Sequence, residues 1–299
     1  MTLHHSLPHP PPKLFPSTDT LLRILCSQRP FYPTHVAAFR RIVLRFYRAA
    51  ARDLPWRRSH SPYHVLVSEI MLQQTHVNRV IHFFPRFIAA FPDFHTLARA
   101  PLHRILRLWN GLGYNRRALA LKHIAQIVLS HYHGNLPSSP SLLARLPGIG
   151  HATASSIAAF AFNLPTLFLE TNIRSVFIHY FFPLHKKVHD CQLLPLLKLT
   201  LDRKHPRRWY NALMDLGATI KNHYPNPSRR SLSYRTQSPF HGSPRQLRAA
   251  ILRTLLTSPA SLASLAKACN TSPHSLYPIL HSLQLDGLVS FSRGRFFIP

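Results

Sequence analysis

The sequence is poor in acidic residues, in cysteine and in long apolar runs. Nine Asp and Glu stand against 37 Lys and Arg in 299 residues, a formal net charge of +28. The three cysteines, Cys26, Cys191 and Cys269, are far apart and form no CxxC pair. We therefore expect no disulfide framework and no cysteine-held metal site, as suits a reducing cytosol. No apolar run reaches the about 18 residues of a membrane-spanning helix.

The N-terminus also lacks the apolar segment of a secretory signal. We expect a cytoplasmic protein without membrane contact. An organelle transit peptide stays open as an alternative, because the first residues are basic and poor in acids.

The excess of positive charge indicates a polyanionic partner, because it steers association with negative surfaces. Nucleic acid is the first candidate and an anionic membrane surface the second. A compositional bias is the competing explanation, since the chain also holds 22 His and 27 Pro. Charge alone does not decide the function.

The first 225 residues show helical patterning and no convincing strand. Residues 1–31 are rich in Pro and His and are expected to be loosely ordered. Apolar residues at three-to-four spacing predict a helix over 35–50. Further helices, separated by glycines that act as stop signals, are predicted over 62–72, 76–91, 102–110, 116–132, 141–145, 152–162, 171–182 and 207–223. The fold class is therefore all-α.

The C-terminal quarter has a different organisation. Residues 224–244 are Pro/Ser-rich and basic, which predicts a linker or an extended DNA-tracking segment. Helices are predicted over 245–256, 261–269 and 272–287, followed by a short β-hairpin about Gly294. Three helices and a hairpin in residues 245–299 resemble a winged helix-turn-helix. Such a domain either docks on DNA or packs only on protein.

The segment LPGIG, residues 146–150, lies between two predicted helices. Gly148 and Gly150 lack a Cβ, so the turn can approach another backbone closely. The following helix presents unpaired N–H groups, and a DNA phosphate fits there. This resembles the helix-hairpin-helix of DNA repair proteins, although most such turns are only tight connections.

The chain contains two glutamates, Glu69 and Glu170. Glu69 lies in a helix with mostly apolar neighbours, so its pKa should be raised as a general acid requires. Glu170 begins a helix after an apolar run. The alternatives are a partly exposed Glu69, an ordinary first-turn acid at 170, and surface salt bridges to the many basic residues.

Five segments carry a family resemblance, and they follow one another in the family's order. They are LPWR (54–57), PYHVLVSEIMLQQTHV (62–77), LWNGLGYNRRA (108–118), LPGIGHATA (146–154) and NALMDLGA (211–218). Over residues 33–220 the chain resembles MutY-type adenine DNA glycosylases of the helix-hairpin-helix superfamily, which includes endonuclease III. SEIMLQQT and GLGY together are specific to the adenine branch, whereas LPGIG alone marks only the superfamily.

The resemblance implies a fold and a role for each matched residue. The fold is two helical lobes around a DNA cleft, one lobe over about 60–162 and the other from 32–59 with 163–223. Glu69 protonates the adenine, and Glu170 stands where an aspartate stabilises the sugar cation. The resemblance implies a base pocket at Trp56, Arg57, Leu72, Thr75 and Asn211. It implies that Gln74 and Tyr114 insert into the duplex, and that Gly148, Gly150, His151 and Thr153 form the phosphate clamp.

The sequence departs from the family in four places. Glu170 is one methylene longer than Asp, and a shift of about 1 Å can cost roughly 100-fold in rate. Ala152 replaces the lysine nucleophile of bifunctional relatives, which predicts no lyase activity. Residues 218–244 contain no cysteine, so the family's iron–sulfur cluster is predicted absent. A winged-helix-like domain stands in place of the usual Nudix-like one.

The basic linker is expected to take over the DNA contacts of the missing cluster loop, through Arg229, Arg230 and Arg235. The prediction is a monomeric, monofunctional glycosylase that needs no metal or other cofactor. It removes adenine mispaired with 8-oxoguanine or guanine from double-stranded DNA, and it is associated with the nucleoid. A thymine or uracil mismatch glycosylase and a non-catalytic DNA-binding protein on the same scaffold remain the alternatives.

Overall fold

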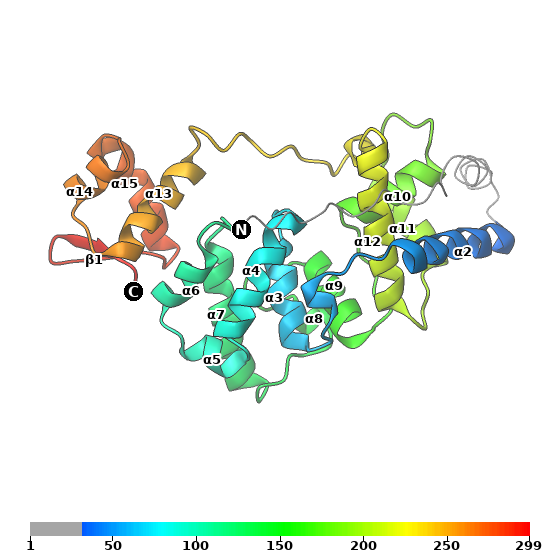
Figure 1. Ribbon diagram of the computed structural model, residues 1–299, viewed down its shortest axis with the longest axis horizontal. Helices are drawn as coiled ribbons and strands as arrows, with labels where there is room; N and C mark the ends of the chain where they lie inside the picture. The colour runs from blue at the N-terminus through cyan, green and yellow to red at the C-terminus, as the bar shows by residue number, and fades with distance from the viewer. Residues whose placement is uncertain (1–31) are drawn as a thin grey trace, which may run out of the picture. The chain divides into compact units, whose positions relative to one another are not determined.

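The computed structural model describes residues 32–299 (Figure 1). The predicted loose segment 1–31 lies outside the described residues. The chain forms two compact units. Unit 1 consists of residues 32–53 and 163–235, and unit 2 of residues 54–162 and 236–299. Between residues 32 and 299, no helix is long and apolar enough to cross a membrane.

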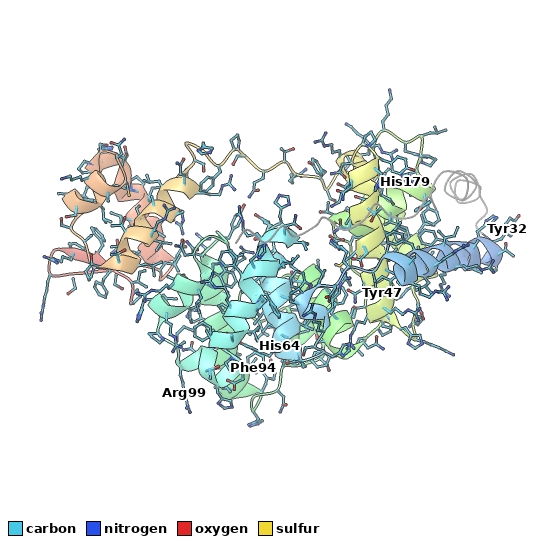
Figure 2. All side chains as sticks on the ribbon, in the orientation of Figure 1. Tyr32, Tyr47, His64, Phe94, Arg99 and His179 are labelled. Atoms are coloured by element: carbon cyan, nitrogen blue, oxygen red, sulfur yellow. The ribbon has the colours of Figure 1, made fainter. Side chains whose placement is uncertain are left out.

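Unit 1 is built around a helix that is buried along almost its whole length. This helix, α10, packs against α12 and the short 3-10 helix η2, and its aromatic rings contact α2. Aromatic rings of α2, α10 and α12 meet in its core, where the Phe39 ring lies 5.7 Å from that of Phe177 and 6.0 Å from that of Trp209. His179 of α10, labelled in Figure 2, is buried beside Tyr224. The elements are α2 (Pro33–Ala50), α10 (Thr171–Phe181), α11 (Asp190–Thr200), α12 (Pro206–His223) and η2 (Pro227–Arg230).

Unit 2 has α3 at its centre. This helix is apolar on nearly all sides and lies against α4, α7 and α9 (Figure 1). A helix that is apolar all round must be buried, and its residues from Val65 to Val67 are at most 5% exposed. The elements are η1 (Pro55–Arg57), α3 (Pro62–Leu72), α4 (Val77–Ala90), α5 (Phe94–Arg99), α6 (Leu102–Trp109), α7 (Arg116–His131), α8 (Pro140–Leu143) and α9 (His151–Phe162).

The C-terminal part of unit 2 has the predicted three helices and hairpin. Strand β1 pairs with β2 in antiparallel register, with Ser290 opposite Phe297. Phe296 of β2 also forms a bridge to Ala260, between the first two helices. The elements are α13 (Pro244–Thr257), α14 (Leu262–Ala268), α15 (Pro273–Leu285), β1 (Ser290–Ser292) and β2 (Arg295–Phe297).

The structure differs from the expected organisation in two respects. Two helices were not predicted, α5 and α11. The first is short and is begun by Asp93, whose side chain accepts a hydrogen bond from Thr96 N at 2.7 Å. The second contains Pro195, which usually ends a helix.

The boundaries between the lobes also differ. Helix η1, expected with residues 32–59 in the second lobe, packs on α3 and α4 in unit 2. Residues 224–235, expected as linker, belong to unit 1. In both cases a short 3-10 helix attaches the segment, η1 by burying Trp56 and η2 by burying Pro227. Helices this short have no periodic pattern of apolar residues in the sequence.

Candidate active site

Glu69 is held between two helices of unit 2. It lies on α3 between the buried residues Ser68 and Ile70, and its own side chain is partly exposed. Ser156 of α9 donates its hydroxyl to Glu69 Oε2 at 2.5 Å. The carboxyl group therefore has a fixed position and remains open to a reactant. The raised pKa expected from the sequence stays a prediction.

The hairpin between α8 and α9 has its two apolar residues buried and its glycines exposed. Leu146 and Ile149 anchor the turn at 3% and 5% exposure. Gly148 has φ +76, and a Cβ there would lie 3.2 Å from the Cβ of Ala120, so glycine suits the position on both counts. Gly150 accepts the first bond of α9, from Ala154 N at 2.8 Å.

The first turn of α9 follows directly from this hairpin. His151 and Ala152 are exposed, and Thr153 is partly exposed. The exposed turn at a helix N-terminus is the arrangement that binds phosphate. Sequence reasoning placed these residues together, and the structure does so too.

Gln73 links the hairpin to α3, and sequence reasoning missed it. Its side-chain amide donates to the carbonyl of Gly148 at 3.2 Å and to Thr153 Oγ1 at 3.3 Å. The residue belongs to the motif SEIMLQQT, but the family resemblance assigns a role only to the next glutamine. Ser156 was missed in the same way, because it contacts Glu69 only after α3 and α9 have packed.

Gln74 and Tyr114 both adopt left-handed backbone conformations, with φ of 53 and 50. Such values are uncommon for residues other than glycine and mark strain or a functional constraint. Gln74 is exposed and Tyr114 is partly exposed. The Tyr114 hydroxyl accepts hydrogen bonds from Gln237 and, at 3.2 Å, from Arg245.

Arg117 is a buried cation that lies between these two residues, and sequence reasoning did not select it. It is 8% exposed, and burial lowers its pKa to about 10, against a smaller opposing effect of Tyr114. It therefore stays charged at neutral pH. Its guanidinium donates to oxygens of two segments, Ile70 O (2.9 Å), Met71 O (2.9 Å), Gln73 O (2.5 Å), Thr75 Oγ1 (3.0 Å) and Gly113 O (3.0 Å).

The remaining base-pocket candidates of unit 2 lie at the beginning and end of α3. Trp56 of η1 is 8% exposed, and its ring makes an edge contact with Phe84 at 5.9 Å. Arg57 and Leu72 are partly exposed. The tryptophan is therefore a packing residue at least as much as a contact for a base.

Glu170 is the N-cap of α10 in unit 1. Its Oε1 accepts hydrogen bonds from the backbone N–H groups of Asn172 and Ile173 at 2.8 and 3.0 Å. Its Oε2 accepts one from Asn172 Nδ2 at 3.1 Å. Hydrogen bonds to a carboxylate are of the strong kind, and the helix N-terminus favours negative charge. The longer side chain thus reaches the same helix end that an aspartate caps.

Helix α12 approaches this carboxylate from the side. A Cβ on Gly217 would lie 2.2 Å from the carbonyl oxygen of Asn172, so only glycine allows the contact. Burial lowers the pKa of Lys221 and outweighs the nearby Glu170 charge, which raises it; Arg52 lowers it further. Asn211, the pocket candidate of this helix, is partly exposed.

The segment after α12 does not fit an iron–sulfur cluster. The chain has three cysteines, none of them between Cys191 and Cys269. In residues 32–299, no group of His, Cys, Asp and Glu is placed to hold a metal ion. Instead η2 packs on α10, and Ser231 forms a parallel bridge with Val188.

Arg230 has a structural role that corrects one expectation. It was expected to contact DNA, but its Nη1 donates to the carbonyls of Phe182, Pro183 and His185 at 2.7 to 3.0 Å. It therefore caps the C-terminal end of α10. Arg229 and Arg235 are exposed, and their DNA contacts stay predictions.

Comparison with known proteins identifies the family. Residues 67–191 match the HhH-GPD superfamily of base excision DNA repair proteins. The adenine DNA glycosylase of Mycolicibacterium smegmatis is 34% identical over 276 residues, which are 85% of this chain and 94% of that protein. The chain belongs to the adenine DNA glycosylase family.

Other members of this family are longer. The adenine DNA glycosylase of Buchnera aphidicola subsp. Baizongia pistaciae is 38% identical over 184 residues, 61% of this chain and 52% of that protein. The human adenine DNA glycosylase is 35% identical over 198 residues, 62% of this chain and 36% of that protein. The chain spans about half the length of the Buchnera relatives.

Solved structures show the same helix-hairpin-helix glycosylase fold. A thermostable thymine-DNA glycosylase aligns with a TM-score of 0.54 and 25% identity, over 61% of this chain and 86% of that one. A trapped endonuclease III–DNA intermediate aligns with a TM-score of 0.51 and 16% identity, over 71% of this chain and 92% of that one. The second likeness concerns the fold alone. The predicted fold class is confirmed.

Proposed function

We propose that the protein is a monofunctional DNA glycosylase that hydrolyses the N-glycosidic bond of adenine mispaired with 8-oxoguanine or guanine. The observation that carries the proposal is the placement of Glu69. It lies within the segment SEIMLQQT, typical of the adenine branch, and Ser156 of the hairpin helix holds its carboxyl group.

The two glutamates suit the two charges that develop in this reaction. As the bond breaks, negative charge grows on the departing base and positive charge on the sugar. A protonated Glu69 would donate its proton to the adenine and make it a better leaving group. Glu170, capping α10, would stabilise the sugar cation. A water molecule would add its hydroxide to the cation, and the proton that it releases would restore the protonated Glu69. Two carboxyl groups in different environments can take these separate roles.

The target base must leave the stack before Glu69 can reach it. Flipping a base costs a few kcal/mol, and less when the base is mispaired. Gln74 is exposed, Tyr114 is partly exposed, and both have left-handed backbones; they would fill the gap. The hairpin Gly148–Gly150 and the first turn of α9 would bind the backbone phosphate. Trp56, Arg57, Leu72, Thr75 and Asn211 are the proposed base contacts.

The absence of an amine at residue 152 is the reason to propose hydrolysis alone. Ala152 is exposed in the first turn of α9, and a methyl group cannot form a Schiff base with the sugar. No metal or cluster takes part in the proposed steps. The proposed partner is double-stranded DNA with a mispair, bound by a monomer in the cytoplasm at the nucleoid.

A thymine or uracil mismatch glycosylase is the second candidate. The similarity to a thermostable thymine-DNA glycosylase, at 25% identity, favours it. Asn211 would serve either base.

Single-turnover cleavage of a panel of duplexes tests the proposal. We expect release of adenine opposite 8-oxoguanine and guanine, and little release from T:G and U:G pairs. Glu69→Gln should abolish release and spare DNA binding. Equal or faster release of thymine or uracil would overturn the adenine assignment. A protein that binds every duplex and cleaves none would point to the non-catalytic alternative.

A further inference from the structure

Arg117 joins two segments of unit 2 that lie far apart in the sequence. These are residues 70–75, at the C-terminal end of α3, and residues 112–114, before α7. One guanidinium nitrogen donates to the carbonyls at the end of α3, and the other donates to both segments. The planar, charged guanidinium group of Arg117 thus donates hydrogen bonds to helix-end carbonyls that would otherwise be buried without donors.

The acceptors of Arg117 flank the two left-handed residues. Gln74 lies between Gln73, whose carbonyl accepts at 2.5 Å, and Thr75, whose hydroxyl accepts at 3.0 Å. Tyr114 follows Gly113, whose carbonyl also accepts at 3.0 Å. Strained backbone conformations persist only where their surroundings over-determine them. Here one side chain supplies that constraint for both turns.

The ring of Tyr114 is fixed by the same cation. The Arg117 guanidinium carbon lies 5.4 Å from the Tyr114 ring centroid and 5.5 Å from that of Trp109, within cation–π range. The Trp109 indole in turn donates to the carbonyl of Gly113 at 3.1 Å. The tyrosine is therefore held in its backbone and in its ring.

We propose that Arg117 is a positioning residue that makes Gln74 and Tyr114 enter the duplex as one rigid pair. The inference rests on the proposed glycosylase function and adds a residue that acts before the chemical step. Because Arg117 is buried, it acts on the target base only through these two side chains. Its loss impairs base extrusion.

The test measures extrusion without excision. All variants carry Glu69→Gln, and the duplex carries 2-aminopurine in place of adenine opposite guanine, so that the fluorescence rise reports the extruded base. Arg117→Lys keeps the charge and loses the fork. We expect it to lower the extrusion equilibrium about tenfold, as loose positioning does. Arg230→Lys is the matched control, because it weakens an arginine cap of the same kind in unit 1, and we expect unchanged extrusion.

A cycle of substitutions at the two surface turns keeps the test independent of how Arg117→Lys folds. With Arg117 present, Gln74→Ala and Tyr114→Ala together should cost little more than either alone, because a rigid pair fails as a unit. In the Arg117→Lys background, the two losses should multiply. The inference is overturned if the Gln74→Ala and Tyr114→Ala losses multiply in the protein that retains Arg117. It is also overturned if the Arg117→Lys protein extrudes the base fully. No fluorescence rise with the parent protein overturns the proposed function itself.

Discussion

Basic side chains cap the C-terminal ends of three helices, α5, α10 and α11, in a chain where acidic partners are scarce. Lys122 donates to the carbonyls of Ala98 and Ala100 at the end of α5, at 2.8 and 2.6 Å. Arg40 donates to the carbonyls of Thr200 and Leu201 at the end of α11. A cation at a helix C-terminus pairs with orphan carbonyls and with the negative end of the dipole. Part of the +28 charge is therefore used inside the fold.

Arg230 and Arg229 are adjacent, but Arg230 binds backbone carbonyls within the fold whereas Arg229 is exposed. Arg230→Gln should lower the free energy of unfolding by about 1–3 kcal/mol, because the turn that follows α10 loses the donor to three of its carbonyls. Arg229→Gln, at an exposed neighbour, should leave it within about 0.5 kcal/mol. Urea titration measures both. Arg230→Gln should also leave the salt dependence of DNA binding unchanged; a shallower slope with intact stability would show that it faces a phosphate.

Glu170 combines a structural role and a proposed chemical role, and two substitutions separate them. Glu170→Gln keeps a side-chain oxygen at the N-cap, so stability should change by less than about 1 kcal/mol. Its excision rate should fall at least about 100-fold, because the negative charge is gone. Glu170→Asp keeps both cap and charge and should stay active. Single-turnover rates and melting curves check these expectations. An active Glu170→Gln protein would show that the negative charge of Glu170 is not needed for excision.

The crossing of α10 and α12 is the contact between elements that matters most to unit 1. It is made possible at Gly217, in the segment NALMDLGA. Two residues earlier, the buried Asp215 accepts from the backbone N–H and Nε of Arg52 at 3.0 and 2.6 Å. The segment thus places α12 against the first turn of α10 and ties it to the end of α2. The sequence showed this motif, but not that its glycine lies against the Glu170 cap.

Gly217→Ala tests that crossing. The new Cβ would fall 2.2 Å from the carbonyl oxygen of Asn172, a backbone atom that cannot turn aside. We expect a loss of about 3 kcal/mol or more in stability, together with loss of activity through Glu170. Gly150→Ala is the control, because a Cβ there meets nothing within 4 Å and should cost under about 1 kcal/mol. Calorimetry compares the two; equal melting temperatures would contradict the close approach.

At the scale of unit 2 as a whole, one carboxylate connects the C-terminal helices to the glycosylase helices. Asp286, at the end of α15, pairs with Arg248 of α13 and, at 2.7 Å, with Arg116 of α7. Burial raises the pKa of Asp286, but hydrogen bonds from Arg116 and Arg248 outweigh burial and hold the pKa below its usual range. The attachment therefore depends on an ionised carboxylate.

Acidification should loosen this attachment. Because the pKa of Asp286 is lower in the folded protein than in the unfolded chain, its ionised form stabilises the fold. This stabilisation is fully present above the unfolded-state pKa of about 3.9. It is lost as the pH falls through the folded-state pKa. Asp286→Asn should cost about 1–2 kcal/mol at neutral pH and make the melting temperature less sensitive to pH below about 4. Thermal melts from about pH 2 to 7 measure this, and parallel curves for both proteins would exclude the role.

The sequence by itself determined which residues are the candidates for the chemistry. Motifs such as SEIMLQQT and LPGIG are local, and a helix with apolar sides or a glycine turn follows from neighbours a few residues away. Glu69, Gly148 and the long helices were therefore accessible without a structure. So was the poor fit to an iron–sulfur cluster, because it depends on counting cysteines.

Only the tertiary structure decided what holds those residues. Ser156 and Glu69 are 87 residues apart, and Arg117 and Thr75 are 42 apart. Such contacts arise from the packing of helices, and no local pattern encodes them. The roles of Gly217, Arg230 and Asp286 have the same origin, because each depends on which helix end or backbone the chain brings against it.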